Sequence, residues 1–366
     1  MPRFLSPSVL LIAFALGVSA CSRADSSAAA APPFTRIDAH AHVFAVAPEL
    51  ISMLERQHMR FMTICVVDKH DIGFEEAAFQ NATGPQITAA SRGMATWCAT
   101  FDPLHWEDPG FADRVIKDLD KSFVDGAIAV KIYKTIGMEL RSKSGEFLLP
   151  DNPVFSPILE HIAAQNKTLF AHIAEPTEAW QPLDPKSSSY SYFKENPVYH
   201  MYQHPGSPSK EAILAARDHL LAMHPKLRVV GCHLGSMEDD VDQIARCLDK
   251  YPNFAVDTAA RVRYLMAQPR EKVRAFFLKY PDRVLYGTDL SCLPRDRPKD
   301  EKELKDWEIH TAKKWETTYA LDWKYFATDE KIETAKLKTQ GLKLPEPILR
   351  KLYHDNAVKW VPGIES

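Results

Sequence analysis

The stretch RIDAHAHV, residues 36–43, places two histidines two positions apart in a run that otherwise is typical of a buried strand. In a strand, residues two apart point to the same side. If Ala39 faces the surrounding helices, His40 and His42 face the interior. Two imidazoles that share one cavity pack poorly unless something binds them, and neutral imidazole is a common ligand of zinc and related ions. The stretch therefore predicts a metal site at the end of a strand.

Seven further runs rich in Val, Ile, Phe and Thr follow, with amphipathic segments between them. This alternation is typical of a parallel sheet with helical crossovers. Eight such runs predict an α/β fold, a (β/α)8 TIM barrel, which commonly needs about 250 residues and grows by loop insertions. An open doubly wound sheet would need a Gly-rich phosphate turn after an early strand, and the sequence has none. The predicted strands are 36–43, 61–68, 94–102, 127–133, 168–175, 228–235, 253–260 and 283–290.

Helices are predicted between these strands, and cap residues mark two of their starts. Asn152 and Ser209 supply side-chain oxygens to the first turns that follow them. The crossover after the second strand is the least defined, somewhere within residues 71–93. The predicted helices are 48–58, 111–123, 153–165, 210–223, 239–250 and 270–279.

Three long segments follow particular strands: 134–152, 176–208 and 291 to about 340. In a barrel they rise from the face where active sites are built, so they are predicted to wall a pocket. Aromatic residues of the second segment are expected to line a ring-binding wall or to pack on one another: Trp180, Tyr190, Tyr192, Phe193 and Tyr199. The third segment carries aromatic residues at helical spacing, which predicts a helix packed on its own domain and leaves a substrate lid or a dimer contact open: Trp315, Tyr319, Trp323 and Phe326.

Composition limits the class of partner. The chain has 366 residues, 45% of them hydrophobic and 25% charged, which is enough to bury a large core. A formal net charge of -3 gives no basic stripe for nucleic acid or for an anionic membrane surface. A small-molecule substrate is therefore the expected partner, and a homodimer is left open. Beyond Cys21 an odd number of cysteines without CxxC spacing favours buried thiols over a disulfide scaffold, with one pair left open: Cys65, Cys98, Cys232, Cys247 and Cys292.

The N-terminus has the pattern of an export signal. Arg3 precedes an apolar run that is too short for a permanent membrane helix, and small residues follow up to Cys21. VSAC, residues 18–21, resembles a bacterial lipobox, in which cleavage precedes a cysteine that becomes lipidated. A signal peptide cut after Ala20 without lipidation, or an N-terminal anchor, is the alternative. The predicted organisation is a signal peptide (1–20), a lipidated tether (21–34) and one barrel domain (35–363), held in the periplasm by a lipid anchor, with the outer membrane left open.

Three more polar side chains occupy the position of the first histidines, just before a loop at the end of an apolar run. His172 lies in FAHIAEP, His233 in GCHLGS and Asp289 in YGTDL. A single strand-end histidine is more often a hydrogen-bonded core residue than a ligand. Four histidines and one aspartate in the same context instead predict one shared site at the mouth of the barrel.

The motifs DAHAH, AHIAEP, CHLGS and YGTDL, in this order, resemble those of the amidohydrolase superfamily. The resemblance is to its amidohydrolase-related (amidohydrolase 2) branch, which includes aminocarboxymuconate-semialdehyde decarboxylase and 2-pyrone-4,6-dicarboxylate lactonase. It implies that one divalent metal ion, zinc above all, is bound by His40, His42, His172 and Asp289; manganese or a binuclear centre is left open. It also implies that Asp289 acts as general base and that His233 polarises the substrate oxygen.

Lys131, Glu175 and Arg261 are further candidates near strand ends. In binuclear relatives a carboxylated lysine on the fourth strand bridges two metals, and Lys131 could complete such a site with His172 and His233. The preferred interpretation is an amine that pairs with a substrate carboxylate or with Glu175. Glu175 is expected beside the ligands or facing substrate, with a surface loop as the alternative. Arg261 is expected to clamp a carboxylate, or else to lie exposed at a helix start.

These features predict a metal-dependent hydrolase that cleaves an ester, lactone or amide of a small substrate, which could be carboxylated or aromatic. The alternative is a metal-dependent non-oxidative decarboxylase of an unsaturated or aromatic acid. A non-catalytic metal-binding or ligand-binding lipoprotein is the third hypothesis. The metal shell is the same for both enzymes, so the sequence does not separate them.

Overall fold

The computed structural model describes residues 34–70, 76–187, 189–334 and 337–365. The predicted signal peptide, Cys21 and nearly all of the tether lie outside these ranges and stay predictions. Within the described part of the chain, no helix is long and apolar enough to cross a membrane. All five described cysteines are buried and unpaired, as expected of core thiols.

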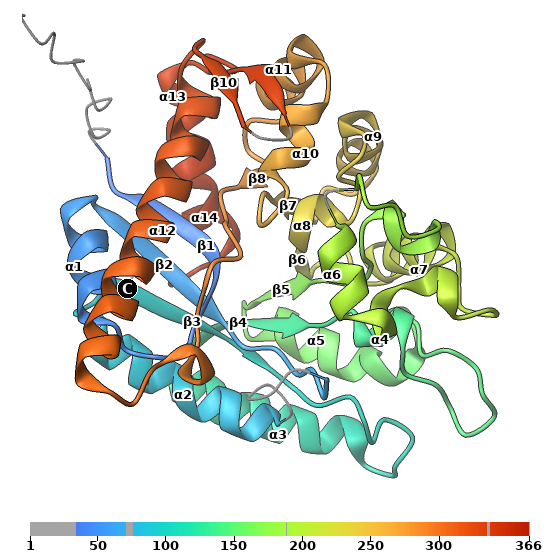
Figure 1. Cartoon of the computed structure of the whole chain (residues 1–366). Coiled ribbons are helices and arrows are strands. Elements are labelled where there is room, and N and C mark those ends of the chain that lie inside the picture. The colour runs from blue at the N-terminus through green and yellow to red at the C-terminus, as the bar shows by residue number, and fades with distance from the viewer. Residues whose placement is uncertain (1–33, 71–75, 188, 335–336, 366) are drawn as a thin grey trace, which may run out of the picture. The chain divides into compact units, whose positions relative to one another are not determined.

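Nine short strands form one parallel sheet, in the order β8-β7-β6-β5-β4-β3-β2-β1-β9 (Figure 1). From β1 to β8, neighbours in sequence are therefore neighbours in space, as helical crossovers between parallel strands require, whereas β9 pairs with β1. A separate antiparallel pair, β10 and β11, lies near the C-terminus of the chain sequence. The strands are β1 (Arg36–Val43), β2 (Met59–Ile64), β3 (Ala95–Thr100), β4 (Ala127–Ile132), β5 (Thr168–Ala171), β6 (Arg228–Gly231), β7 (Phe254–Asp257), β8 (Val284–Leu285), β9 (Ser291–Cys292), β10 (Lys331–Glu333) and β11 (Lys338–Gln340).

The segment from β8 to β9 closes the sheet on itself. On one side β8 pairs with β7. On the other side the backbone N–H of Ala39 in β1 donates to the carbonyl of Tyr286 at 2.9 Å, and β9 pairs with β1. Because one segment bonds to both the seventh and the first strand, the sheet is an eight-segment (β/α)8 barrel, as the sequence predicts.

Fourteen α-helical segments of the described chain connect or cover the strands, and the predicted caps are present. The Ser209 side chain accepts from the backbone N–H of Ala212, and Asn152 from that of Val154. Helices α2 and α3 lie outside the strands in Figure 1. The helices are α1 (Pro48–Arg56), α2 (Ala77–Ala90), α3 (Phe111–Val124), α4 (Thr135–Met138), α5 (Ser156–Ala164), α6 (Tyr190–Glu195), α7 (Lys210–Met223), α8 (Cys232–Gly235), α9 (Val241–Lys250), α10 (Val262–Ala267), α11 (Arg270–Lys279), α12 (Glu301–Ala327), α13 (Glu346–Arg350) and α14 (Asn356–Trp360).

Single turns add to these helices. Five are 3-10 turns, and one is a π-helical turn between α13 and α14. They are η1 (Pro153–Phe155), η2 (Thr177–Trp180), η3 (Pro197–Tyr199), η4 (Met201–Gln203), η5 (Pro294–Asp296) and η6 (Lys351–Asp355).

The eighth predicted strand is shorter than expected, because the backbone turns inside it. The predicted run 283–290 contains only β8, and pairing with β1 resumes at Ser291. Asp289 has φ of +66°, a left-handed conformation that an extended strand does not allow. Gly287 lies against β1, where an added Cβ would come within 2.8 Å of the His40 Cβ. The break lets the chain turn beside β1 and presents Asp289 to the end of that strand.

Helix α12 packs on its own domain, which confirms the prediction for this aromatic segment. Trp315, Tyr319 and Phe326 are buried. The Tyr319 hydroxyl donates to Asp38 of β1 at 3.1 Å. One turn further, Asp322 accepts from the Tyr286 hydroxyl at 2.9 Å. The helix thus joins the barrel where its first and last strands meet.

The pH dependence of stability tests this packing, because Asp322 is a buried acid. Burial raises the pKa of Asp322 to about 7, against the hydrogen bond from Tyr286, and nearby Asp38 raises it further. Tyr319 and Tyr353 also face this carboxyl group. Between about pH 4 and pH 7 the folded chain keeps a proton on Asp322 that the unfolded chain has released. The free energy of unfolding therefore falls as the pH rises. Above about pH 7 the full free-energy cost of burying the ionised carboxylate is present.

Asp322→Asn is therefore expected to stabilise the fold at pH 8, by an amount on the order of 2–4 kcal/mol, and to have much less effect at pH 4. The measurement is urea unfolding at both pH values. Asp306→Asn, on the exposed side of the same helix, serves as the control. An equal effect of Asp322→Asn at the two pH values would show that the carboxyl group is not a buried acid.

Candidate metal centre

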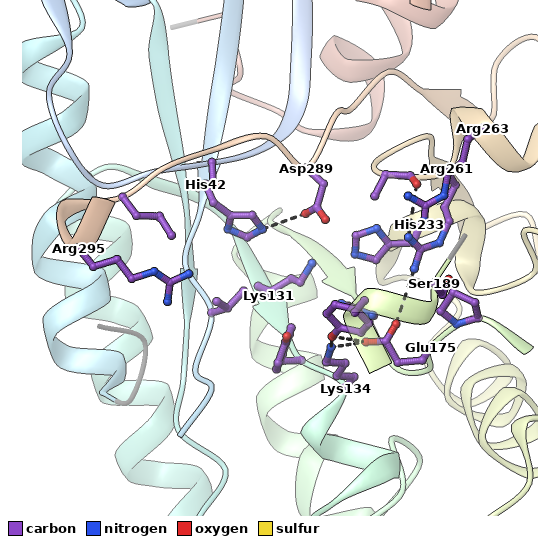
Figure 2. A pocket seen from close by; sticks show the side chains of 18 residues that line it. His42, Lys131, Lys134, Glu175, Ser189, His233, Arg261, Arg263, Asp289 and Arg295 are labelled. Atoms are coloured by element: carbon purple, nitrogen blue, oxygen red, sulfur yellow. Dashed lines mark hydrogen bonds and ion pairs between the residues drawn. The ribbon is translucent and has the colours of Figure 1, made fainter. Parts of the chain in front are cut away.

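A pocket of about 470 Å³ opens among the carboxyl ends of the strands (Figure 2). Each of the three predicted insertions contributes to its lining. Lys134 comes from the first, Ser189 and Tyr192 from the second, and Leu293 and Arg295 from the third. The pocket therefore lies where the barrel fold predicts an active site.

Three of the predicted metal-site side chains meet at this pocket, which His42 and Asp289 line and beside which His40 is buried. The Asp289 Oδ1 atom lies 3.2 Å from His42 Nε2 and 3.4 Å from His40 Nε2. In Figure 2 the His42 ring points towards Asp289, with His233 on the other side of the carboxylate. Ligand atoms of His40, His233 and Asp289 all lie within 4.8 Å of one another. His233, expected beside the metal, is thus one of its candidate ligands.

His172 joins the cluster through His233. The centroids of these two rings are 4.2 Å apart. The Nε2 atom of His172 is buried and has no hydrogen-bond partner among the described residues. A buried polar nitrogen without a partner is costly, and a bound cation would satisfy it.

The other ring nitrogens are held by acceptors, which fixes the direction of the imidazoles. His40 Nδ1 lies 2.7 Å from Asp257 Oδ2, His42 Nδ1 lies 2.8 Å from the Ile64 carbonyl and His233 Nδ1 lies 2.9 Å from the Ala259 carbonyl. An N–H at each Nδ1 leaves the lone pair on Nε2 facing the pocket. The donor set of imidazole nitrogens and a carboxylate therefore fits a zinc-type cation.

The charge states also suit a cation. Burial lowers the pKa of His40, His172 and His233, so these imidazoles are neutral at pH 7. Burial acts to raise the pKa of Asp289, but His233, His42 and His40 outweigh it and hold that pKa well below its usual value. Neutral imidazoles and an ionised carboxylate are the forms that bind metals. Which of these side chains bind an ion stays a prediction.

Backbone strain is concentrated at the same strand ends. After β6, β7 and β8, several non-glycine residues have positive φ, between 57° and 66°. Such conformations persist only where the surrounding structure enforces them, and they are frequent at functional sites. The residues are His233, Leu234, Ser236, Ala260 and Asp289.

The three additional candidates all line the pocket, with different partners. Lys131 Nζ lies 3.3 Å from His40 Nε2 and 3.0 Å from Cys232 Sγ. Glu175 is buried and forms its ion pair with Lys134 rather than with Lys131. Arg261 is buried, with a guanidinium nitrogen 3.8 Å from Glu175. Arg261 also stands at the start of α10, but because it is buried, the alternative of an exposed arginine at a helix start is wrong.

Other residues of the site were not predicted from the sequence. Asp257, the last residue of β7, holds His40 and also accepts from the backbone N–H of His233 at 2.7 Å. The strand-end rule that identified Asp289 could have found it in FAVDTAA. Lys134, Arg263 and Arg295 also line the pocket. Lys134 precedes α4, Arg263 lies in α10 and Arg295 in η5, and these short elements were not predicted from the sequence.

Comparison with known proteins gives one family. A sequence profile described as Amidohydrolase matches residues 37–363. A search of curated proteins found no match. Among solved structures, an amidohydrolase II is 15% identical, with a TM-score of 0.48, over 89% of this chain and 99% of that one.

Two other solved structures give similar values. A 2,6-dihydroxybenzoate decarboxylase in complex with 2,6-dihydroxybenzoate is 13% identical, with a TM-score of 0.48, over 90% of this chain and 99% of that one. A 4-oxalomesaconate hydratase from Rhodopseudomonas palustris is 13% identical, with a TM-score of 0.45, over 90% of this chain and 97% of that one. At these values the reaction of a neighbour does not transfer to this chain.

Proposed function

This chain belongs to the amidohydrolase family, and from that membership and the pocket we propose that it is a metal-dependent hydrolase that cleaves an ester, lactone or amide of a small substrate. The observation that carries the proposal is the convergence of Nε2 atoms and one ionised carboxylate at the carboxyl ends of the strands. His40, His42, His172 and Asp289 would hold the ion, with His233 beside it. A divalent cation supplies Lewis acidity, which makes water a nucleophile at neutral pH.

The side chains of the site supply proton transfer. Ionised Asp289 accepts the proton of the attacking water as general base. The Nδ1–H of His233 is directed to the Ala259 carbonyl, so its neutral ring accepts at Nε2. His233 therefore donates to a substrate oxygen or a leaving group only in its protonated form, after it has taken a proton within the site. The role expected from the sequence, in which His233 polarises the substrate oxygen, is therefore limited to the protonated ring.

The pocket charge favours a substrate that carries a carboxylate. Its only lining carboxylates among the described residues are Glu175 and Asp289. Five cationic side chains line the same pocket, and an excess of positive charge in a cleft attracts and holds anions. In Figure 2, Arg295 lies on the opposite side of the pocket from Arg261 and Arg263. The cationic residues are Lys131, Lys134, Arg261, Arg263 and Arg295.

Decarboxylation of an unsaturated or aromatic acid is the second candidate, and the same cationic lining favours it because it would hold the carboxylate beside the metal site. A panel of carboxylated esters, lactones, amides and aromatic acids, tested with the zinc-loaded and manganese-loaded chain, separates the two. Release of a new carboxylate with uptake of water supports the hydrolase. Release of carbon dioxide without uptake of water supports the lyase. Turnover that survives removal of all metal would contradict both.

The proposal includes a location, which rests on the sequence alone. Cys21 and the segments beside it favour a periplasmic enzyme tethered to a membrane by lipid. Detergent partitioning of the chain expressed in a Gram-negative host tests this. Membrane attachment that is lost in Cys21→Ser supports the anchor, and attachment that is kept would contradict it.

A further inference from the structure

We propose that Lys134 is a positioning residue that fastens part of the second insertion to the barrel and so sets one wall of the pocket. The fastened part is residues 189–208, named here the β5 insertion, which supplies Ser189 and Tyr192 to the pocket. The effect on substrate binding rests on the proposed function. The fastening itself does not.

Lys134 is buried, and its ammonium group is enclosed by aromatic rings. Its Nζ lies 3.7 Å from the centroid of the Tyr199 ring and 5.1 Å from the centroids of both the Tyr133 and Tyr192 rings. A cation over the face of a tyrosine ring is attracted by it, by about 0.5–2 kcal/mol, more when it is desolvated. Two of these rings, those of Tyr192 and Tyr199, belong to the β5 insertion.

The same ammonium group also holds the polar atoms beside it. It donates to Glu175 and to the Tyr192 hydroxyl. The Tyr192 hydroxyl in turn donates to Glu175 at 2.9 Å. Figure 2 shows Lys134 and Glu175 joined at one edge of the pocket. One cation thus links the end of β4, the loop after β5 and two separate turns of the β5 insertion.

The cluster of rings reaches the candidate metal centre. Tyr133 packs edge to face against His172, with ring centroids 5.2 Å apart. Tyr133 also contacts Tyr199, with centroids 6.4 Å apart. Loss of the cation would therefore loosen the insertion wall and the support of one predicted ligand together. Substrate binding is expected to suffer first, because Tyr192 lines the pocket directly.

Chemical rescue tests the role of the charge. Lys134→Ala removes a propylammonium equivalent from between the rings, and added n-propylammonium can occupy that space. The first measurement is the rate of trypsin cleavage at Lys194, inside the β5 insertion, which needs no substrate. Cleavage is expected to accelerate on the order of tenfold in Lys134→Ala and to return towards the wild-type rate with n-propylammonium but not with 1-propanol. Lys143→Ala, in the loop after β4 and outside the pocket, is the control.

A second pair of variants covers the case in which Lys134→Ala does not fold. Tyr199→Phe keeps the ring over the ammonium group, whereas Tyr199→Leu removes it. Fast cleavage in Tyr199→Leu and wild-type cleavage in Tyr199→Phe support the proposal. Equal cleavage rates in Tyr199→Phe and Tyr199→Leu would overturn the proposal. Rescue of Lys134→Ala by 1-propanol as well as by n-propylammonium would also overturn it.

Turnover provides the independent second readout. With a substrate in hand, Lys134→Ala is expected to raise KM on the order of tenfold with a smaller change in kcat, and n-propylammonium is expected to reverse it. If cleavage responds as expected while no hydrolysis is found, the fastening holds and the proposed function fails. If hydrolysis is found but neither cleavage nor KM responds, the positioning role fails alone.

Discussion

Asp289→Asn is expected to lower kcat by about 10²–10⁴-fold while the chain stays folded. Asparagine keeps the size of the side chain but cannot accept the proton of the attacking water. It also removes the carboxylate whose Oδ1 lies 3.2 Å from His42 Nε2 and 3.4 Å from His40 Nε2. The loss is therefore expected in kcat more than in KM, since the changed group acts on the reacting atoms.

The measurement is steady-state kinetics at saturating metal, with circular dichroism to confirm folding. Asp282→Asn is a matched control, because Asp282 lies just before β8 and pairs with Lys351 at the surface. Its kcat is expected to equal that of the wild type. A kcat within tenfold of wild type for Asp289→Asn would show that another group is the base.

His40→Ala is expected to destabilise the fold as well as to remove the metal. His40 and Asp257 are both fully buried, and their ring nitrogen and carboxylate oxygen lie 2.7 Å apart. Loss of the imidazole leaves the buried Asp257 carboxylate without one of its hydrogen-bond donors, which costs about 1–3 kcal/mol. The free energy of unfolding of the metal-free proteins, measured in urea, should fall by this order.

His42→Ala is the matched comparison, because the carboxylate that it leaves, Asp289, is partly exposed, whereas Asp257 is fully buried. The His42 ring is partly exposed; its Nδ1 faces the Ile64 carbonyl and its Nε2 faces Asp289. We expect this variant to lose catalysis like His40→Ala and to lose clearly less stability. Equal destabilisation by the two substitutions would mean that the contact between His40 and Asp257 contributes little to the fold.

The barrel could be predicted from the sequence because each strand is a short apolar run with a turn signal after it. β1 has the predicted bounds, and β4 differs by one residue at its end. The eighth strand was predicted too long, because one-residue conformations such as the positive φ of Asp289 have no signature in hydrophobic pattern. Helix α2 could be placed only within a broad range, since Gly84 and Pro85 interrupt its pattern.

The polar residues of the site also divide into those that could be predicted from the sequence and those that could not. The fold brings the predicted residues to one place because they lie in the last half of β1 or shortly after another strand: His40, His42, His172, His233 and Asp289. Contacts that form only between loops could not be predicted. Arg295 and the ring of tyrosines around Lys134 depend on how insertions fold over the barrel, which pattern alone does not fix. Asp257 lay within reach of the strand-end rule and was missed.

Metal content tests the central claim most directly. The purified chain is dialysed against excess zinc and then against buffer. Its ratio of zinc to protein is then measured by elemental mass spectrometry. About one zinc ion per chain is expected for the wild type, and close to none for His40→Ala or His42→Ala. A ratio near two would place Lys131 in a binuclear centre. A wild-type chain that turns over substrate without bound metal would contradict the account.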